Sequence, residues 1–541
     1  MMKNVLYLTG EEENRMFKKK DNCTSIQEIV ERNTGMKIEK FLESQKNPYI
    51  KNLKEAVALL LQHKQEPIHI IGDFDVDGIS ATLIMIYGLF MAGLSFQYRL
   101  PHRFSEGYGL SEKIIDEIQS GVVITVDNGI SARKAIKKAK EKGLTVIVTD
   151  HHQAVTQEDE ILLPEADIIV NPSIEEESEF HSLCGAGIAY YFVKQLLGKD
   201  VIELLVMAAI ATVADVVPLI GPNRALVKQG IEALNQGYGV PGLLSLLQVM
   251  NKEIINEDDF GFCIGPILNA TGRLLDNGSE KTLSFLLMSS TNPKLEEVTQ
   301  KFIDMNGCRK MITKKAIQQA EEDYKGDRPI VIYNPNLGEG IIGLVAGQFS
   351  EKYQCPVICF TKTKHGFLKG SGRSIPEIHL KNTLDKMQNL IVSYGGHAGA
   401  AGLSIKEENL DEFIKAFTQA CGTIPPLCKD TFYDLSITED ELPNVMEQLK
   451  LYAPYGEGNN KILFHIRCNF KQNNFRKIGD GTHILHYSPS LKIIGYGKSA
   501  QFDALVEKYG FPEQLNCVGY LSESWFQNKC TYQLELVDFE R

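Results

Sequence analysis

The chain has 541 residues, more than one hydrophobic core usually organises, so about two to four domains are expected. Hydrophobic residues make up 43% and charged residues 23%, as in ordinary globular proteins, and the longest apolar runs are too short or too close to acids for a membrane span. The 11 cysteines are scattered without CxxC spacing, which argues against a zinc ribbon or a disulfide framework and favours a reducing cytoplasm. The formal net charge of −12 does not exclude a nuclease, because a metal site needs clustered acids and one local basic groove can bind a strand.

The N-terminal half predicts a parallel sheet. Residues 1–50 have the mixed charge of a helical lead-in, without identifiable chemistry. From residue 68 onward, short β-branched runs alternate with helical stretches. The expected strands are 68–71, 122–126, 145–149 and 167–170, and the expected helices include 80–92 and 132–142. This alternation is typical of a doubly wound α/β fold, in which ligands bind at the carboxyl ends of the strands.

The C-terminal half predicts three further parts. Residues 293–324 have helical periodicity and predict a long connecting helix. A second α/β unit begins at residue 329 and runs to about residue 405. After the Pro425-Pro426 break, short alternating segments predict the strands of a small β-barrel, at 461–467, 491–496, 514–521 and 531–537.

Acids and imidazoles follow three successive predicted strands. The first strand leads into a segment that carries Asp73, Asp75 and Asp77 at spacing two. Such side chains point the same way if the backbone stays extended, and they then repel one another unless they protonate, splay apart or hold a cation. Further acids and histidines follow the next two strands and end a later apolar segment. They are Asp127, Asp150, His151, His152 and Asp215.

Each of these groups also has a structural explanation. Asp127 or Asp150 alone could be a helix N-cap, an adjacent His pair is more often structural than ligating, and the first acidic loop could bind calcium, although it lacks the downstream Glu of an EF-hand. Recurrence at three strand ends favours a metal site, because the topology brings these ends to one edge of the sheet. Carboxylates with a histidine suit Mn²⁺ better than Mg²⁺ or Ca²⁺, and two such ions sharing a carboxylate could activate water for phosphoester hydrolysis.

Four segments resemble the motifs of the DHH phosphoesterase superfamily, in the same order. They are DFDVDG at 73–78, VDNG at 126–129, DHH at 150–152 and ADVVPL at 214–219. Within that superfamily, the whole chain from about residue 50 is most similar to the RecJ exonucleases.

The resemblance implies a role for each acid and histidine. Asp75 would bind one Mn²⁺ ion, Asp77 would bind a second, and Asp127 would bridge them, with Mg²⁺ as the alternative metal. The remaining assignments are His151 and Asp215 as ligands of the second ion, His152 as a contact to the scissile phosphate or leaving group, Asp73 as a direct or supporting ligand, and Asp150 as the group that orients a histidine.

The second α/β unit carries glycine-rich segments. Residues 395–402, GGHAGAAG, allow close approach of a backbone or a phosphate, although the same composition suits a helix packed on a sheet. This segment resembles the DHHA1 domain motif, whose histidine, here His397, reaches the substrate across the interdomain cleft. Residues 338–347 resemble the glycine-rich helix start of that domain.

Arginine and hydroxyl side chains predict phosphate sites. Ser371 and Arg373 stand on a glycine-rich segment that could be a flexible phosphate cradle or an ordinary surface turn. In the RecJ pattern the matching residues bind the 5′ phosphate, with Arg103 as their partner. Residues 265–274 also resemble the family, so that Arg273 would clamp a phosphate near the metals and Asn269 would hold the loop.

Aromatic residues are the predicted contacts to bases. Tyr108 could stack on a terminal base or be buried. Residues 452–460 resemble the segment that leads into the RecJ OB-fold, where Tyr520, Trp525 and Phe526 could stack on a single strand, although aromatic residues in a small barrel more often form its core.

The resemblance implies both a domain layout and an activity. The expected parts are a lead-in at 1–50, a DHH catalytic domain at 51–275, a connecting helix at 276–325, a DHHA1 domain at 326–420 and an OB-fold domain at 421–541. The implied activity is 5′→3′ hydrolysis of single-stranded DNA to 5′ mononucleotides in recombination and repair, with a single-strand-binding protein or a helicase as possible partners. The alternatives are a phosphodiesterase for short oligonucleotides or cyclic dinucleotides, and a non-catalytic DNA-binding scaffold.

Overall fold

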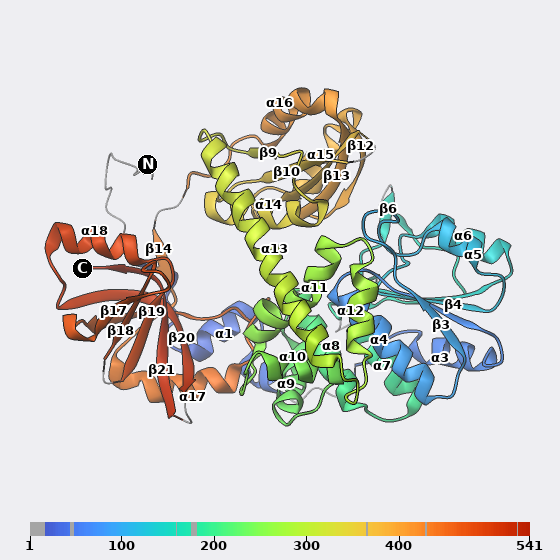
Figure 1. Cartoon of the computed structure of the whole chain (residues 1–541), viewed down its shortest axis with the longest axis horizontal. Helices are drawn as coiled ribbons and strands as arrows, with labels where there is room; N and C mark the ends of the chain where they lie inside the picture. Colours follow the sequence, from blue (N-terminus) through green and yellow to red (C-terminus); the bar gives the residue numbers. More distant parts are fainter. Residues whose placement is uncertain are drawn as a thin grey trace. The chain divides into compact units, whose positions relative to one another are not determined.

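A computed structural model describes residues 17–43, 48–157, 160–174, 181–363, 366–427, 430–488, 490–526 and 529–541. The chain divides into two compact units, which Figure 1 colours along the sequence. We call residues 45–427 the central unit, and residues 1–44 together with 428–541 the terminal unit. In the described residues, no helix combines the length and the apolar character that crossing a membrane requires.

The first sheet of the central unit is parallel throughout, as the sequence predicts. Its order is β3-β2-β4-β5-β8, and four of its strands coincide with the expected ones to within one residue. The strand at the β3 edge was not predicted. The bounds are β2 (Ile68–Ile71), β3 (Phe96–Arg99), β4 (Val122–Val126), β5 (Thr145–Thr149) and β8 (Ile168–Val170), with a separate hairpin of β6 (Val155–Gln157) and β7 (Glu160–Leu162).

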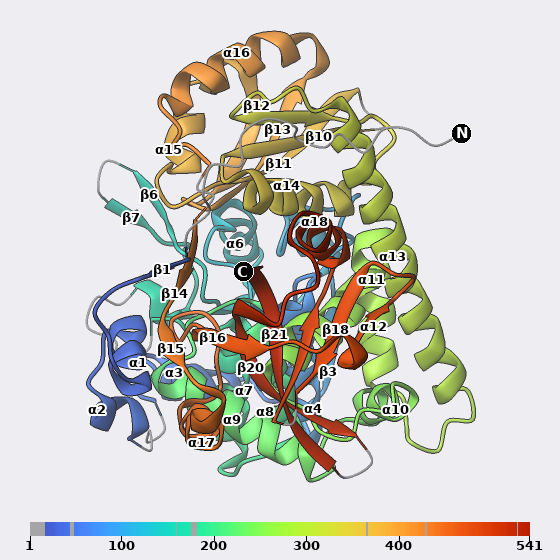
Figure 2. The same ribbon diagram turned by 90° about the vertical axis from the view of Figure 1, so that its left-hand side faces the viewer.

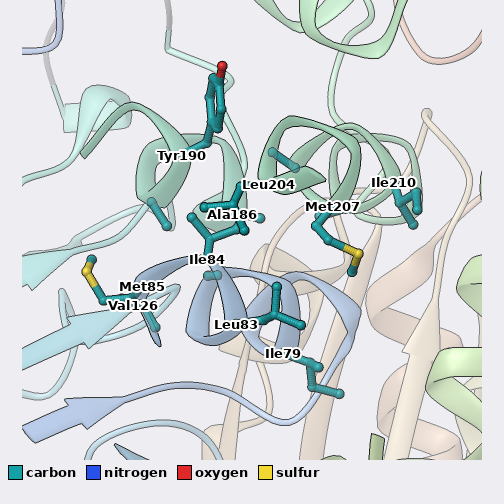
Figure 3. Close-up of a cluster of buried hydrophobic side chains, with 14 of the residues drawn as sticks. Ile79, Leu83, Ile84, Met85, Val126, Ala186, Tyr190, Leu204, Met207 and Ile210 are labelled. Atoms are coloured by element: carbon teal, nitrogen blue, oxygen red, sulfur yellow. The ribbon is translucent and has the colours of Figure 1, made fainter. Parts of the chain in front are cut away.

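Helices cover both faces of this sheet (Figure 1). Alternate strand residues face opposite sides: Val123 packs in the cluster of α5 and α6, whereas Ile124 packs in the cluster of α3, α4 and α7. Figure 3 shows the second cluster, where Leu83 and Ile84 of α4 meet Met207 of α8. The helices are α3 (Leu53–Gln62), α4 (Val76–Met91), α5 (Glu112–Glu117), α6 (Arg133–Glu141), α7 (Gly185–Leu197) and α8 (Ile202–Ala214).

The rest of the first α/β part is helical. After α9 (Gly221–Asn235) and α10 (Pro241–Val249), α11 (Gly265–Leu274) packs on the long helix α13 (Leu295–Asp323), which confirms the expected connecting helix. A separate short helix, α12 (Gly278–Leu286), precedes it, so residues 276–325 form two helices.

The second α/β part of the central unit has a mixed sheet. Its order is β12-β13-β11-β10-β9, in which only the β9–β10 pair is parallel. Residues 395–402, for which a packed helix was the alternative, lie on β12 and β13 and the turn between them. The elements are β9 (Ile330–Tyr333), α14 (Glu339–Tyr353), β10 (Val357–Lys362), β11 (Phe367–Arg373), α15 (Leu380–Asp385), β12 (Ile391–Gly396), β13 (Ala400–Lys406) and α16 (Leu410–Cys421).

The terminal unit contains the predicted strand-rich C-terminal domain. One sheet has the order β15-β16-β20-β21-β19-β18-β17 (Figure 2). Two helices within it were not predicted, α17 (Leu442–Tyr452) and α18 (Ser499–Tyr509). The strands are β14 (Thr431–Tyr433), β15 (Leu435–Ile437), β16 (Leu463–Asn469), β17 (Phe475–Ile478), β18 (His483–Tyr487), β19 (Leu491–Gly495), β20 (Gln514–Phe526) and β21 (Lys529–Glu540).

The N-terminal segment is part of this same unit. Strand β1 (Phe17–Lys19) pairs in parallel with β14, and α1 (Ile26–Thr34), which precedes α2 (Ile38–Leu42), packs on α17. Figure 2 shows these blue elements beside β14 and α17. Buried Asp434 joins the two ends of the chain: its Oδ1 lies 2.7 Å from Nη2 of Arg32 and 3.2 Å from Nζ of Lys20. From the sequence, these two ends were predicted to be separate parts of the molecule.

Candidate metal centre and phosphate-binding site

The first acidic motif turns from strand into helix sooner than an extended chain would. Asp75 is the N-cap of α4, and its Oδ1 accepts hydrogen bonds from the backbone N–H groups of Asp77 (3.0 Å) and Gly78 (3.2 Å). Asp77 therefore lies in the first helical turn. The backbone therefore does not stay extended through the three carboxylates, because capping the helix curls the chain after Asp75.

The N-terminus of α7 holds the Asp77 carboxylate. The backbone N–H groups of Gly185 and Ala186 each donate to it at 2.7 Å, which places a negative charge at a helix end that favours it. Glycine is required at position 185, since a Cβ there would lie 2.4 Å from the Cβ of Asp127. Asp77 and Asp127 are thus brought together by one helix end.

Asp127 follows β4 in a left-handed conformation, with φ of 61°, and is 2% exposed. This conformation is uncommon outside glycine, asparagine and aspartate, and it turns the carboxylate toward the third strand end. There, Nε2 of His151 lies 3.1 Å from Oδ1 of Asp127 and 3.6 Å from a carboxylate oxygen of both Asp77 and Asp215. One imidazole nitrogen therefore faces three acids that come from different elements.

The second histidine is held by Asp150 and Tyr108. Nδ1 of His152 lies 2.8 Å from Oδ1 of Asp150, whose other oxygen accepts from the backbone N–H of Ile130 at 2.9 Å. The Tyr108 hydroxyl donates to the carbonyl of Asp127 at 2.8 Å and lies 3.0 Å from Nδ1 of His152. The Tyr108 ring is 48% exposed, so a stacking role stays a prediction.

Three groups of side chains have ligand atoms close enough to share an ion. Asp127 belongs to two of them, which makes it the carboxylate common to neighbouring positions. The groups are Asp73 with Asp75 and Asp127, Asp127 with His151 and His152, and Asp77 with His151 and Asp215.

The site contains buried polar atoms that lack a hydrogen-bond partner among the described residues. These atoms are Oδ1 of Asp127 and Nε2 of His151. These two atoms lie 3.1 Å apart, but no hydrogen bond joins them. Because buried polar atoms are almost always paired, both atoms point to a missing partner. A carboxylate oxygen and an imidazole nitrogen are a donor set that a divalent transition metal accepts, and the residues present therefore fit such an ion.

Five neighbouring carboxylates repel one another. We call them the acidic cluster, and they belong to Asp73, Asp75, Asp77, Asp127 and Asp215. Burial and the Asp77 and Asp75 carboxylates raise the pKa of Asp215 to about 9 and that of Asp127 well above its usual range. Asp150 differs: burial works against its charge, but the hydrogen bond to His152, the charges of His152 and His151 and the Ile130 N–H together outweigh burial and lower its pKa. For His152, burial is likewise outweighed by the bond to Asp150 together with the charges of Asp150, Asp215 and Asp77, which raise the pKa to about 9. A bound cation would remove the repulsion at Asp215 and Asp127.

Arg103 and Arg273 border the acidic cluster. The Arg103 guanidinium lies 4.5 Å from the centre of the Phe74 ring, next to the acidic motif. Nη1 of Arg273 donates to the carbonyl of Gly340 at 3.2 Å, and a Cβ at position 340 would lie 2.1 Å from the Arg273 carbonyl oxygen. The glycine-rich start of α14 thus lets the second α/β part approach Arg273 closely. Asn269 holds the loop of the first acidic motif, since its Oδ1 accepts from the Val76 N–H at 3.1 Å.

Ser371 and Arg373 lie on strand β11, so the expected flexible loop is wrong. Glycines at alternate positions permit close packing against β10 and β13, which explains why a glycine-rich segment is a strand here. Nη1 of Arg373 donates to the Gly372 carbonyl at 2.7 Å and to Oγ of Ser371 at 3.3 Å. Both side chains face α14 at Gly343, where a Cβ would lie 3.0 Å from Oγ of Ser371.

His397 lies in the turn after β12 and is exposed. Burial and the charges of Arg373 and His379 lower its pKa, which places it beside the Ser371–Arg373 pair. Among the described residues, no hydrogen bond or ion pair joins His397 to the acidic cluster. The side chains of Trp525 and Phe526 lie outside the described part of the chain.

Two supporting residues escaped the sequence analysis. The Asn128 amide donates to the carbonyls of Ile71 (3.0 Å) and Val126 (2.9 Å), which fixes the ends of β2 and β4 relative to each other. Asp276 accepts hydrogen bonds from the backbone of Phe104 and Ser105, which holds the loop that carries Arg103. Asn128 lies within the VDNG motif and could have been found there, whereas nothing local marks Asp276.

Known proteins share this arrangement of two α/β parts and a strand-rich C-terminal domain. Family models match three successive regions: the DHH family N-terminal domain at 67–214, the DHHA1 domain at 326–423 and the RecJ OB domain at 433–538. The "Single-stranded-DNA-specific exonuclease RecJ" of Haemophilus influenzae is 36% identical over 418 residues, which are 71% of this chain and 71% of the relative. The chain belongs to the RecJ family. RecJ of Bacillus subtilis is 30% identical over 513 residues, covering 90% of this chain and 63% of the relative.

Solved RecJ structures share the fold. The crystal structure of Thermus thermophilus RecJ in complex with Mn²⁺ matches with a TM-score of 0.79 at 25% identity, covering 95% of this chain and 75% of that one. A structure of the same RecJ with Mg²⁺ has a TM-score of 0.73. The RecJ likeness therefore extends over both units.

Proposed function

We propose that this RecJ-family chain is a metal-dependent exonuclease specific for single-stranded DNA, and that it removes 5′ mononucleotides in the 5′→3′ direction. The observation that carries the proposal is the facing pair of unpaired buried atoms, Oδ1 of Asp127 and Nε2 of His151, at the junction of the acidic groups. Family membership supports the substrate, since relatives are named for single-stranded DNA.

The acids and His151 would hold two Mn²⁺ ions, with Mg²⁺ as the alternative. Asp75 and Asp73 would hold one ion, Asp77, His151 and Asp215 the other, and Asp127 would bridge them. Bound divalent ions supply water activation at neutral pH and stabilise charge on the leaving oxygen of a phosphodiester.

The surrounding side chains would bind and orient the strand. His152, fixed by Asp150, presents a positive imidazolium to the scissile phosphate. Arg273 would clamp a phosphate at the edge of the metal cluster, while Arg103, Ser371 and Arg373 would receive the 5′ phosphate.

Two further side chains complete the proposed site. His397 would contact the strand near Arg373, and the exposed Tyr108 ring would stack on the terminal base. The OB domain would favour single strands through stacking on their bases, with little reading of base edges. A cytoplasmic role in recombination and repair, with a single-strand-binding protein or a helicase as partner, completes the proposal.

The test uses single-stranded oligonucleotides labelled at either end, with and without a 5′ phosphate, in Mn²⁺, Mg²⁺ or chelator. We expect metal-dependent loss from the 5′ end that is faster for phosphorylated strands. Loss from the 3′ end, or cleavage restricted to short oligonucleotides or cyclic dinucleotides, would overturn the proposed substrate. Strand binding without cleavage in any metal would instead indicate a non-catalytic scaffold.

A further inference from the structure

Helix α11, which carries Arg273, packs on α13, which carries Arg309. Burial and the charges of Arg103, Arg309 and Arg373 together lower the pKa of Arg273 to about 10. Three of these four arginines have a proposed role at the 5′ or scissile phosphate. Arg309, on the long helix α13, does not, and no motif of the sequence marks it.

Arg309 is held in a fixed position by its own helix. Its Nε and Nη2 both donate to Oδ1 of Asn306, at 3.0 and 2.8 Å. Asn306 is 6% exposed, and so is buried on the face of α13 that packs against the protein. These bonds leave Nη1 of Arg309 without a partner among the described residues. The guanidinium is therefore oriented before any ligand arrives, which reduces the entropy lost on binding.

No described carboxylate forms an ion pair with Arg309, Arg273, Arg103 or Arg373. Burial alone lowers the pKa of Arg309 and of Arg373, with no acid to offset it. Asp75, in contrast, acts on both Arg103 and Arg273. Arg309 and Arg373 are therefore partly buried guanidinium cations with no acid acting on them, and phosphates match the geometry of such groups.

We propose that Arg309, oriented by Asn306, binds a further backbone phosphate of the DNA strand, distinct from both the 5′-terminal and the scissile phosphate. This inference rests on the proposed nuclease function. It assigns α13 a substrate-binding role in addition to its role as a connection. Asn306 acts as a positioning residue, because it touches the guanidinium and not the strand.

The experiment compares Arg309→Gln with Lys314→Ala in the full chain. Glutamine removes the charge while keeping a polar, unbranched side chain. Lys314 is an exposed cation on the same helix, about 140° around its axis from Arg309, and so controls for loss of charge. Two 5′-phosphorylated substrates are used, a dinucleotide, which has no phosphate beyond the scissile one, and a long single strand.

For Arg309→Gln we expect KM for the long strand to rise about ten-fold at nearly unchanged kcat, because one charged contact outside the reacting centre is lost. Dinucleotide turnover should stay at the wild-type level. Strand binding in chelator should show a salt dependence shallower by about 0.7 in the log–log slope. Lys314→Ala should match the wild type in all three measurements.

Equal behaviour of Arg309→Gln and Lys314→Ala would overturn the assignment, as would an equal loss on the dinucleotide. If Arg309→Gln lowers the melting temperature, Arg309→Lys decides: retained affinity supports a phosphate contact, and affinity lost to the same extent contradicts it. A wild-type protein inactive on both substrates would refute the proposed function itself, which is a different result from an active wild type with an unaffected variant.

Discussion

Two buried aspartates show how differently this molecule treats a charge. Asp434, in the terminal unit, is 1% exposed and receives Arg32, Lys20 and the backbone N–H of Leu463. Asp127, in the central unit, is 2% exposed and faces other acids, with Oδ1 unpaired among the described residues. The first arrangement links two distant stretches of chain. The second is unfavourable until a cation arrives, which is expected where stability is given up for a binding site.

The largest expected effect comes from Asp127→Asn. Asparagine tolerates the left-handed backbone but cannot carry the bridging charge, so exonuclease activity should fall about a thousand-fold or more. The same change removes the repulsion between position 127 and the neighbouring carboxylates. The metal-free variant should therefore have a higher melting temperature than the metal-free wild type, and its free energy of unfolding should be larger by about 1–2 kcal/mol. Activity assays and thermal melts in chelator check both parts.

Asp304→Asn is the matched control, because Asp304 is an exposed carboxylate on α13. It should change neither quantity. If Asp127→Asn kept a tenth of the activity, the bridging role would be wrong.

Removing Arg32 should destabilise the terminal unit. In Arg32→Ala the buried Asp434 keeps only Lys20 and a backbone N–H, and breaking such a pair costs about 3 kcal/mol. Denaturant unfolding monitored in the full chain measures this loss. Lys37→Ala, which removes a solvent-exposed ion pair with Glu31 in the same segment, should leave the unfolding curve unchanged. Equal effects of the two substitutions would remove the distinction between the two aspartates.

Manganese should stabilise the protein through the central unit. At a concentration about 100-fold above its dissociation constant, one bound ion adds about 2.7 kcal/mol. The melting temperature should be higher in Mn²⁺ than in chelator for the wild type and for Arg32→Ala. For Asp127→Asn this difference should be much smaller. The same metal shift in all three proteins would place the ion elsewhere.

The smallest effect is expected for Ser371→Ala. The hydroxyl contributes one hydrogen bond beside Arg373, so the preference for a 5′-phosphorylated strand should fall about three- to ten-fold. The ratio of kcat/KM for phosphorylated and unphosphorylated strands measures it. Ser404→Ala, on the neighbouring strand β13, is a control that should preserve the ratio.

The sequence predicted the parts of the site that local patterns encode. Strand ends at Val126 and Thr149 follow from β-branched runs, and parallel topology then brings Asp127 and His151 to one edge. The curl after Asp75 was missed because an N-cap and an extended acidic loop have the same composition. Ser371 and Arg373 were placed on a loop because glycines usually mark turns, whereas here they let strands pack closely.

Long-range pairing could not be read from the sequence. Arg32 and Asp434 are 402 residues apart, and nothing near either residue names its partner. Arg309 is similar, since its neighbours on α13 look like an ordinary solvated helix and its significance comes only from the arginines of other elements.

The terminal unit combines the two ends of the chain, and this affects how the protein folds while it is being synthesised. Ile26, Ile29 and Val30 of α1 are buried beside α17, a helix that the ribosome makes about 400 residues later. At about 5–20 residues per second, this apolar face waits for about 20–80 s, while the whole central unit emerges and can fold. Helix α1, the first in the described part of the chain, is therefore among the last to find its place, and it is the segment that a holding chaperone would protect during translation.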